Sequence, residues 1–424
     1  MKICVVAYKF GTEKEIGEHL GTYHYFIEKM RRLVTLGHEV TVVAPFLSFF
    51  KKGSVDVNGV KIKRYWPPMM ASIWAWPLNR IIFFIYSVRT QKMVLEAVRQ
   101  GCKIVYVWQA RETGYAVAKI KHRLGVPFIF RQITAWHWHF QRTPKDIFGE
   151  KPWYKFFYKI GMGGILNFKL KLLLGKKRQM KYAKAIYKNA DAIVFLSKAA
   201  IREGKELGLD ESKSIDLGIS IEENIFKPLG NKNDLRKKLG LRGKKIILFI
   251  GRINFEEKGI GYLLEAMPEV RARISDASLA IIGGGGESEK MKALIENLGV
   301  GGSVQILGRK PFSELPEYIN AADVFVVPSI WMEAFGQVTI EGMSCGLPVI
   351  TTDAGASPEI NIDGQTGLVV PIKNSKALAD AIVKILSDEN LQKQMGDDAR
   401  KRVMENYTYD AIIKKFLKII EHTL

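Results

Sequence analysis

Short, unbroken runs of β-branched and other apolar residues recur along the whole chain and constrain the fold more than any other feature. They lie at residues 2–7, 39–45, 103–108, 127–130 and 192–197, and again at 245–250, 278–283, 303–308, 324–328, 348–352 and 367–371. The longer segments between them have the apolar spacing of helices. Runs that do not alternate with polar residues are typical of parallel strands covered by helices on both faces. The pattern predicts an α/β fold with doubly wound, Rossmann-like sheets.

The runs fall into two sets, and each set opens with a strand that leads into a glycine-bearing segment. A chain of 424 residues exceeds what one hydrophobic core usually supports. We therefore expect two domains, residues 1–205 and 206–424, with a final helix at about 409–424 that is a candidate to pack back on the first domain. Ligands of such sheets bind beyond the carboxyl ends of the strands, so the interdomain cleft is the expected place for a large substrate.

The charge balance and the cysteines narrow the class of protein. A total of 64 Lys and Arg against 43 Asp and Glu gives a formal net charge of +21, which attracts nucleic acid, anionic membranes or phosphorylated substrates. Cys4, Cys102 and Cys345 lack metal-type spacing, which argues against a zinc site and a disulfide framework and favours a reducing cytoplasm. The first apolar run is too short for a signal peptide, and the uncharged stretch 66–79 is too short to span a bilayer.

Two carboxylates flank the start of a predicted helix after the run 324–328. Glu333 lies in the intervening loop, Gly336 marks the helix start, and Glu341 lies about one turn inside the helix. A helix N-terminus has unpaired N–H groups and partial positive charge, which suit a phosphate or a hydroxyl group. A carboxylate such as Glu341 can accept hydrogen bonds from both hydroxyls of a diol. The structural alternative is that Glu333 only complements the helix dipole and Glu341 faces solvent.

Two further clusters follow strands of the second half. Gly251 and Arg252 come directly after the strand 245–250, and Lys258 follows six residues later, so that a planar fork and a point charge could bracket a diphosphate. A solvated charged turn would also explain them. The glycine run 283–286 permits close approach of a ligand to the backbone. It lacks the spacing of a dinucleotide fingerprint, and a flexible turn is its structural alternative.

Together these clusters resemble the donor-binding half of the family four retaining glycosyltransferases, which have the GT-B fold. The most specific part is PSIWMEAFGQVTIEGMSCGLPVI (328–350), followed by DAGASPE (353–359). The resemblance extends over nearly the whole chain. It implies that residues 1–205 form an acceptor-side domain, that residues 206–424 form the donor domain, and that a sugar is moved from a nucleotide diphosphate with retention of configuration, without a metal or another cofactor.

The resemblance also implies roles for individual residues. Glu333 would contact the donor sugar, Glu341 would hold the ribose, and the Arg252 and Lys258 cations would neutralise the UDP or GDP leaving group. Gly21 and Gly251 would lie near the diphosphate, and the backbone amides of Gly336, Gln337 and Val338 would face the sugar and the distal phosphate. The base would lie near Gly283, Gly284 and Arg309.

The amino-terminal half departs from the family pattern at two points. Leu20 replaces the first glycine of the loop that contains Gly21. Many members have a histidine after the strand that begins with a Val-Pro pair, where this chain has Ile133 and Thr134. Thr134 and His137 are therefore the candidate acceptor-side residues, with His139 as the alternative histidine, although an aromatic-flanked histidine is more often packed or on the surface.

The positive charge is concentrated in one segment. Residues 151–190 contain no Asp or Glu, and their lysines alternate with aromatic residues and leucines; residues 66–88 add a second aromatic patch. This pattern predicts docking on an anionic membrane surface. A groove that binds nucleic acid is a weaker interpretation, and we expect no nucleic-acid partner. The third interpretation is a helical subdomain whose lysines are only solvated.

We therefore expect a peripheral enzyme at the inner face of the cell membrane that transfers a hexose to a lipid-linked or glycan acceptor. The alternatives are a nucleotide-sugar epimerase on the same fold and a non-catalytic subunit that binds sugar nucleotides. An epimerase would need no acceptor, and a binding subunit would not hydrolyse the donor.

Overall fold

The computed structural model describes residues 1–16, 21–48, 50–68, 78–108, 111–133, 152–165 and 176–424. The chain divides into two compact units, of which the first comprises Met1–Leu217 with Ile413–Leu424 and the second comprises Gly218–Ile412. The domain boundary expected after residue 205 falls within a helix, Lys198–Glu206, of the first unit. The last helix, α21 (Tyr409–Thr423), begins in the second unit and continues into the first.

The first unit contains an eight-stranded sheet in the order β3-β4-β2-β1-β5-β6-β7-β8. All neighbouring strands are parallel except the β3–β4 hairpin. Its strands are β1 (Lys2–Ala7), β2 (Glu39–Pro45), β3 (Asp56–Val57), β4 (Val60–Tyr65), β5 (Ile104–Trp108), β6 (Phe128–Arg131), β7 (Ala192–Phe195) and β8 (Ser214–Asp216). Its described helices are α1 (Glu13–Ile16), α2 (Gly21–Thr35), α3 (Leu78–Arg99), α4 (Arg111–Lys119), α5 (Lys121–Leu124), α8 (Pro152–Lys159), α10 (Lys176–Asn189) and α11 (Lys198–Glu206), with a 3-10 turn at Glu211–Lys213.

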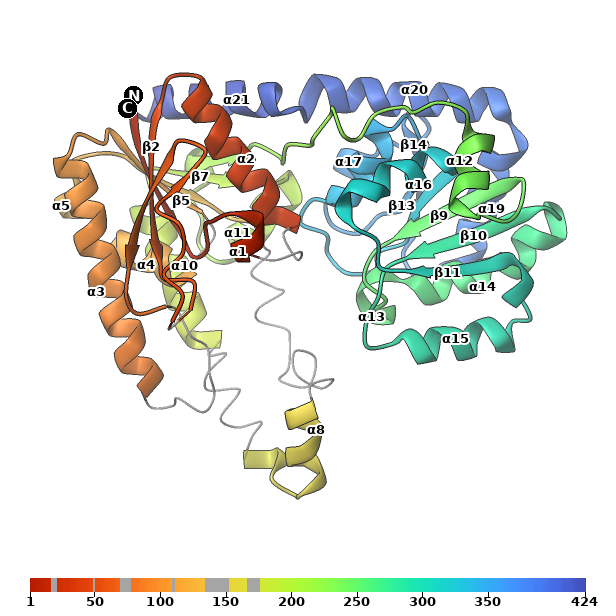
Figure 1. Cartoon of the computed structure of the whole chain (residues 1–424), viewed down its shortest axis with the longest axis horizontal. Coiled ribbons are helices and arrows are strands. Elements are labelled where there is room, and N and C mark those ends of the chain that lie inside the picture. Colours follow the sequence, from red (N-terminus) through yellow and green to blue (C-terminus); the bar gives the residue numbers. More distant parts are fainter. Residues whose placement is uncertain (17–20, 49, 69–77, 109–110, 134–151, 166–175) are drawn as a thin grey trace. The chain divides into compact units, whose positions relative to one another are not determined.

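The second unit contains a six-stranded, all-parallel sheet in the order β11-β10-β9-β12-β13-β14. Figure 1 shows α14 and α15 on one side of this sheet and α12 and α16 on the other. The strands are β9 (Lys245–Ile250), β10 (Ala277–Ile282), β11 (Val304–Gly308), β12 (Val324–Val327), β13 (Val349–Thr352) and β14 (Gly367–Val370). The helices are α12 (Lys232–Leu239), α13 (Phe255–Lys258), α14 (Ile260–Arg273), α15 (Ser288–Asn297), α16 (Leu315–Ala321), α17 (Gln337–Ser344), α18 (Ser357–Ile360), α19 (Ser375–Ser387) and α20 (Glu389–Asn406), with 3-10 turns at Gly301–Ser303 and Phe312–Glu314.

Burial explains why the strands read as continuous apolar runs. Every residue of β5, β10, β12 and β13 is buried, so no position is left for a solvated side chain. The two doubly wound, Rossmann-like sheets predicted from the sequence are confirmed. The strands β3, β4 and β8 were not predicted. The β4 sequence VKIKRY alternates apolar and basic residues, because a strand near the sheet edge keeps part of its side chains in water.

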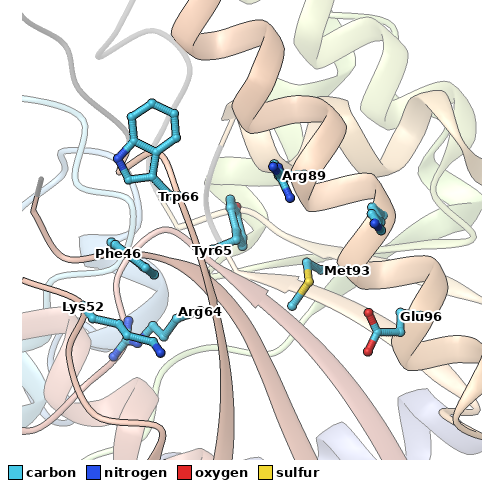
Figure 2. Close-up of a pocket in the computed structure, with 9 residues that line it drawn as sticks. Phe46, Lys52, Arg64, Tyr65, Trp66, Arg89, Met93 and Glu96 are labelled. Carbon is cyan, nitrogen blue, oxygen red and sulfur yellow. The ribbon is translucent and has the colours of Figure 1, made fainter.

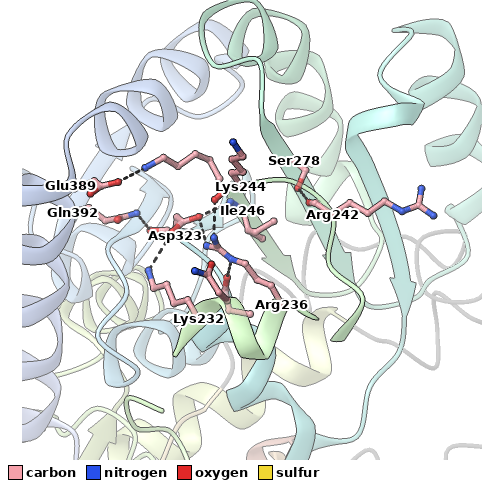
Figure 3. Close-up of polar contacts among 12 residues, drawn as sticks. Lys232, Arg236, Arg242, Lys244, Ile246, Ser278, Asp323, Glu389 and Gln392 are labelled. Atoms are coloured by element: carbon pink, nitrogen blue, oxygen red, sulfur yellow. Dashed lines mark hydrogen bonds and ion pairs between the residues drawn. The ribbon is translucent and has the colours of Figure 1, made fainter. Parts of the chain in front are cut away.

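A buried aspartate fastens the two central strands of the second unit at their amino ends. Asp323 directly precedes β12 and is 6% exposed, and its Oδ2 accepts hydrogen bonds from the Ile246 backbone amide of β9 at 2.7 Å and from Arg236 Nη2 at 2.6 Å (Figure 3). Arg236 also donates to the carbonyls of Ala321 and Lys244, each at 2.8 Å. The neighbouring strands β9 and β12 are far apart in sequence, and this network fixes their relative register.

We predict that Asp323→Ala weakens the β9–β12 pair specifically, because it leaves the largely buried Arg236 guanidinium without its carboxylate. Losing one partner of a buried pair costs about 3 kcal/mol. Hydrogen–deuterium exchange of the β9 and β12 amides should therefore accelerate by about a hundredfold. The matched control is Lys232→Ala, since the Lys232 ammonium lies 3.4 Å from Asp323 but is 42% exposed, and its loss should have little effect. Unchanged exchange in Asp323→Ala would contradict this role.

Candidate functional site

The second sheet has a topological switch point at β9 and β12. The chain moves outward from β9 through β10 to β11, then returns to the other side of β9 with β12 and continues to β13 and β14. Loops that leave two such strands diverge above and below the sheet, and ligands of open α/β sheets bind in the crevice between them. Arg252 and Lys258 follow β9, and Glu333 follows β12. The fold therefore brings these three predicted residues to one edge of the sheet.

Lys258 and Glu333 form an ion pair across the switch point. The Ser329 hydroxyl donates a second hydrogen bond to the same Glu333 oxygen at 2.9 Å. Burial by itself raises the pKa of the Glu333 carboxyl, but the charge and hydrogen bond of Lys258, the Ser329 hydrogen bond and the charge of Arg252 together hold that pKa below its usual range. Glu333 is therefore an ionised, acceptor-only group at neutral pH. An anionic ligand that uses Lys258 must share it with this carboxylate.

Arg252 is held much more loosely. Its side chain is 60% exposed, and one guanidinium nitrogen lies 2.8 Å from an Oε2 atom of Glu257. An exposed pair of this kind contributes little to stability, so the guanidinium can exchange its partner at small cost. The arrangement thus combines one fixed cation, Lys258, with one adjustable cation.

The loops after β9 and β12 approach each other closely enough to exclude a side chain at one position. A Cβ atom on Gly259 would lie 1.9 Å from the Pro328 carbonyl oxygen, and Gly259 has a left-handed φ of +63°. The amides of Ile330 and Trp331 donate to the Glu257 carbonyl at 3.0 and 3.2 Å. Only glycine fits at this crossing, and the crossing sets Lys258 opposite Glu333.

A third loop fixes the backbone of Glu333. The Ala356 amide donates to the Glu333 carbonyl at 2.9 Å. A Cβ atom on Gly355 would lie 2.4 Å from the same carbonyl oxygen, and Gly355 has a φ of +59°. The DAGASPE segment of the sequence motif therefore supports the position of Glu333.

Helix α17 begins where the sequence predicts, with Gly336 in the left-handed conformation before its first residue, Gln337. No side chain caps this end, so the amides of the first turn point outward in the direction of the helix dipole. Glu341 is only 3% exposed, so the alternative that it faces solvent is wrong. Its carboxylate accepts a hydrogen bond from Gln337 Nε2 at 2.9 Å. Burial raises the pKa of the nearby Cys345 thiol to about 12, and the charge of Glu341 adds to that shift.

The glycine run at the end of β10 has a packing role. A Cβ atom on Gly283 would lie 1.8 Å from the Gly251 carbonyl oxygen, and one on Gly285 would lie 2.3 Å from that of Ile253. These glycines let the β10 loop pass against the β9 loop. A Cβ atom on Gly284 would lie 3.0 Å from Arg309 Nε, which places Arg309 along the same edge.

The remaining predicted residues lie elsewhere. Gly21 is the first residue of α2 in the first unit. The candidate acceptor-side residues lie outside the described residues, namely Thr134, His137 and His139. No role was predicted for Ser329, which stands in the quoted motif and whose hydroxyl donates a hydrogen bond to the Glu333 carboxylate. Among the described residues, no group of three or more His, Cys, Asp or Glu side chains is arranged to hold a metal ion.

As a whole, the edge presents two cations, an open helix N-terminus and two carboxylates. Cations and helix-terminal amides stabilise a diphosphate as charge accumulates on it, and carboxylates accept hydrogen bonds from sugar hydroxyls. The set can therefore hold a polyhydroxylated group linked to a diphosphate.

Family comparisons agree with this chemistry. Residues 21–222 match the model described as "Glycosyltransferase Family 4", and residues 231–402 match the model described as "Glycosyl transferases group 1". Together the two matches cover most of the chain, and each lies almost wholly within one unit.

Curated proteins with similar sequences include glycosyltransferases. A GDP-mannose-dependent alpha-(1-6)-phosphatidylinositol monomannoside mannosyltransferase of Mycolicibacterium smegmatis is 32% identical over 181 residues, which are 41% of this chain and 47% of that protein. Spore coat protein SA of Bacillus subtilis is 31% identical over 199 residues, 45% and 52% of the two chains. The chain spans about half the length of the curated relatives it matches.

Solved structures agree over the full chain. A sucrose-phosphate synthase of Thermosynechococcus elongatus superposes with a TM-score of 0.72 at 20% identity, covering 99% of this chain and 98% of that one. Anabaena HepE in complex with UDP and glucose superposes with a TM-score of 0.69 at 16% identity, covering 99% of both chains. At these identities the likeness establishes the fold, and it confirms the GT-B class that the sequence predicts.

Proposed function

The chain belongs to the family 4 glycosyltransferases of the GT-B fold, and we propose that it moves a hexose from a UDP- or GDP-linked donor to an acceptor with retention of anomeric configuration. The observation that carries the proposal is the meeting of Arg252, Lys258, Glu333 and the start of α17 at the switch point of the second sheet. A donor of either base is consistent with the relatives, since one is GDP-mannose-dependent by name and one solved neighbour holds UDP and glucose.

In the proposed reaction the bond between the anomeric carbon and the diphosphate oxygen breaks, and its electron pair leaves with the diphosphate. Arg252 and Lys258 stabilise the charge that develops there, together with the first-turn amides of α17, which include Gln337 and Val338. These cations supply the stabilisation that other transferases draw from a metal ion. The acceptor hydroxyl attacks from the face that the diphosphate leaves, and its proton passes to the departing phosphate.

The two glutamates position the donor in this proposal. Glu333 is ionised and accepts hydrogen bonds from the sugar hydroxyls while Lys258 exchanges part of its contact with Glu333 for the phosphate. Glu341 is buried one turn into α17 and accepts from the ribose hydroxyls, in exchange for or beside Gln337. Neither group acts as a nucleophile.

We propose that the acceptor is lipid-linked or a glycan at an anionic membrane surface, and that the protein works there as a peripheral cytoplasmic enzyme. In the first unit, α8 carries Lys155 and Lys159, and it exposes Phe156 and Tyr158. Exposed aromatic residues beside lysines are the pattern of an interfacial helix. Among the helices of the described ranges, none combines the length and the apolar content needed to cross a bilayer. One relative is named for a phosphatidylinositol mannoside acceptor, which is consistent with a lipid acceptor here.

The transfer proposal predicts that Arg252→Ala and Lys258→Ala each lower turnover by at least about a hundredfold, because stabilisation of the leaving diphosphate is lost. The measurement is release of GDP or UDP from GDP-mannose and UDP-glucose. The matched control is Lys292→Ala on α15, an exposed cation paired with Glu289 away from the switch point, which should leave turnover unchanged. Thermal melting of each variant checks that it folds. Near-normal turnover in both folded variants would refute the assignment, and inversion at the sugar C2 without transfer would favour an epimerase.

The membrane proposal predicts flotation of the protein with vesicles that contain phosphatidylglycerol at low salt, and its loss as salt rises. Lys155→Gln with Lys159→Gln should reduce partitioning by about thirtyfold, since each lysine near an anionic surface contributes about 1 kcal/mol. Lys61→Gln with Lys103→Gln removes the same charge from exposed positions of the same unit and is the control. If the protein does not float with these vesicles at low salt, the membrane proposal is contradicted.

A further inference from the structure

The first unit contains a cavity of about 380 Å³ that the donor site does not use. It lies beyond the carboxyl ends of β2 and β4 and against the C-terminal half of α3 (Figure 2). Its basic lining residues are Lys52, Arg64, Arg89 and Lys92, and Phe46, Tyr65 and Trp66 form its aromatic wall. The volume is within the range of small-ligand sites, and the carboxyl edge of a parallel sheet is where such sites form.

Three cations of this cavity are held in no ion pair within the described residues, although the charge of Lys92 acts on the nearby Glu96. Lys52, Arg89 and Lys92 are exposed, and none forms a salt bridge or hydrogen bond within the described ranges. The one acid in the lining, Glu96, is already bound to Lys63 at 3.1 Å and to Gln100 at 3.1 Å. The lining thus keeps a positive excess that attracts an anion.

A fourth cation is fixed in the lining. The Arg64 guanidinium donates to three backbone carbonyls, those of Ser54 at 3.1 Å, Pro45 at 3.3 Å and Phe10 at 2.5 Å. Burial lowers the pKa of Arg64, and the nearby charge of Glu15 opposes that shift. Its hydrogen bonds are committed to the fold, so Arg64 adds positive potential to the cavity without being free to move to a ligand.

The same helix that supplies Arg89 and Lys92 exposes an apolar stripe. Ile81, Phe84 and Val88 are 56%, 68% and 45% exposed, and their spacing of three and four residues places them on one face of α3. The stripe ends one residue before Arg89. Contiguous exposed apolar side chains beside a basic site are typical of a surface that contacts lipid or another apolar partner.

We infer that this cavity binds the phosphate of a phosphorylated amphiphile. The phosphate lies among Lys52, Arg89 and Lys92, the rest of the head group lies against the aromatic wall, and the hydrocarbon chain follows Ile81, Phe84 and Val88 along α3. The inference rests on the proposed function in one respect, since it identifies the lipid-linked acceptor as a phosphorylated lipid. The cavity's positive excess and the adjoining stripe carry it independently of the donor chemistry.

Isothermal calorimetry on the full chain tests the anionic part. The probes are dihexanoylphosphatidic acid below its micelle concentration, glycerol 3-phosphate and inorganic phosphate. Arg89→Gln with Lys92→Gln should weaken dihexanoylphosphatidic acid binding by at least about tenfold, because two charge-assisted contacts are lost. Lys61→Gln with Lys103→Gln is the control for net charge and should bind as the wild type does. Unchanged affinity in the Arg89 and Lys92 variant, or no binding of any probe to the wild type, would overturn the inference.

The apolar part has a separate test. Phe84→Ser with Val88→Ser should weaken dihexanoylphosphatidic acid by about tenfold and leave glycerol 3-phosphate unchanged, because only the lipid has a chain to lay on the stripe. Inorganic phosphate binding as tightly as the lipid would overturn the assignment to an amphiphile. GDP and UDP affinity should be equal in the wild type and in both variants. Failure of the proposed function would appear in nucleotide binding, and failure of this inference would appear in phosphate binding.

Discussion

Two carboxylates hold β9 against β12, and the site depends on that pairing. Asp323 ties the strands at their amino ends through Ile246 and Arg236, and Glu333 ties the loops at their carboxyl ends through Lys258. The two strands are neighbours in the sheet although β10 and β11 separate them in sequence. Because both ends are fixed, the first turn of α17 and the two cations occupy defined positions at the switch point. A slip in this pair would separate the cations from the helix end.

The ion pair at the carboxyl end also fixes the position of the Lys258 side chain at the site. The Lys258 side chain is only partly exposed, and Glu333 supplies its opposing charge with support from Ser329. A diphosphate can then replace part of the carboxylate's contact without first creating a buried, unpaired ammonium. Arg252 is exposed and loosely paired, so in the proposed reaction it can follow the charge that develops on the diphosphate. Lys258 therefore has a fixed position, whereas Arg252 can change its partner.

The sequence predicted much of this arrangement because parallel strands leave local signatures. Unbroken apolar runs identified five of the eight strands of the first sheet and all six strands of the second. Residues just past them, such as Arg252 and Glu333, could be assigned to the carboxyl edge. What it could not predict depends on contacts between loops remote in sequence. Nothing local to Lys258 indicates that Glu333 will be its partner. The glycine run was interpreted as room for a ligand, and the structure adds a packing role that was not predicted, since Gly283 makes room for the Gly251 carbonyl.

The first unit shows the same limit. The aromatic character of residues 66–88 was visible in the sequence, but the cavity is formed by the loop after β2, the end of β4 and α3 together. Glu96, an acid of the lining, pairs with Lys63, and a pattern of residue types does not reveal which lysine it takes. Charge counting along the chain therefore could not distinguish cations that are committed to partners, such as Arg64, from cations that remain available.

The measurement that tests the central claim most directly is a crystal structure of the chain with UDP or GDP bound. The account predicts a diphosphate in contact with Arg252, Lys258 and the first-turn amides of α17, and ribose hydroxyls on Glu341. A nucleotide bound elsewhere, with the Lys258–Glu333 pair intact and only solvent at the start of α17, would contradict it.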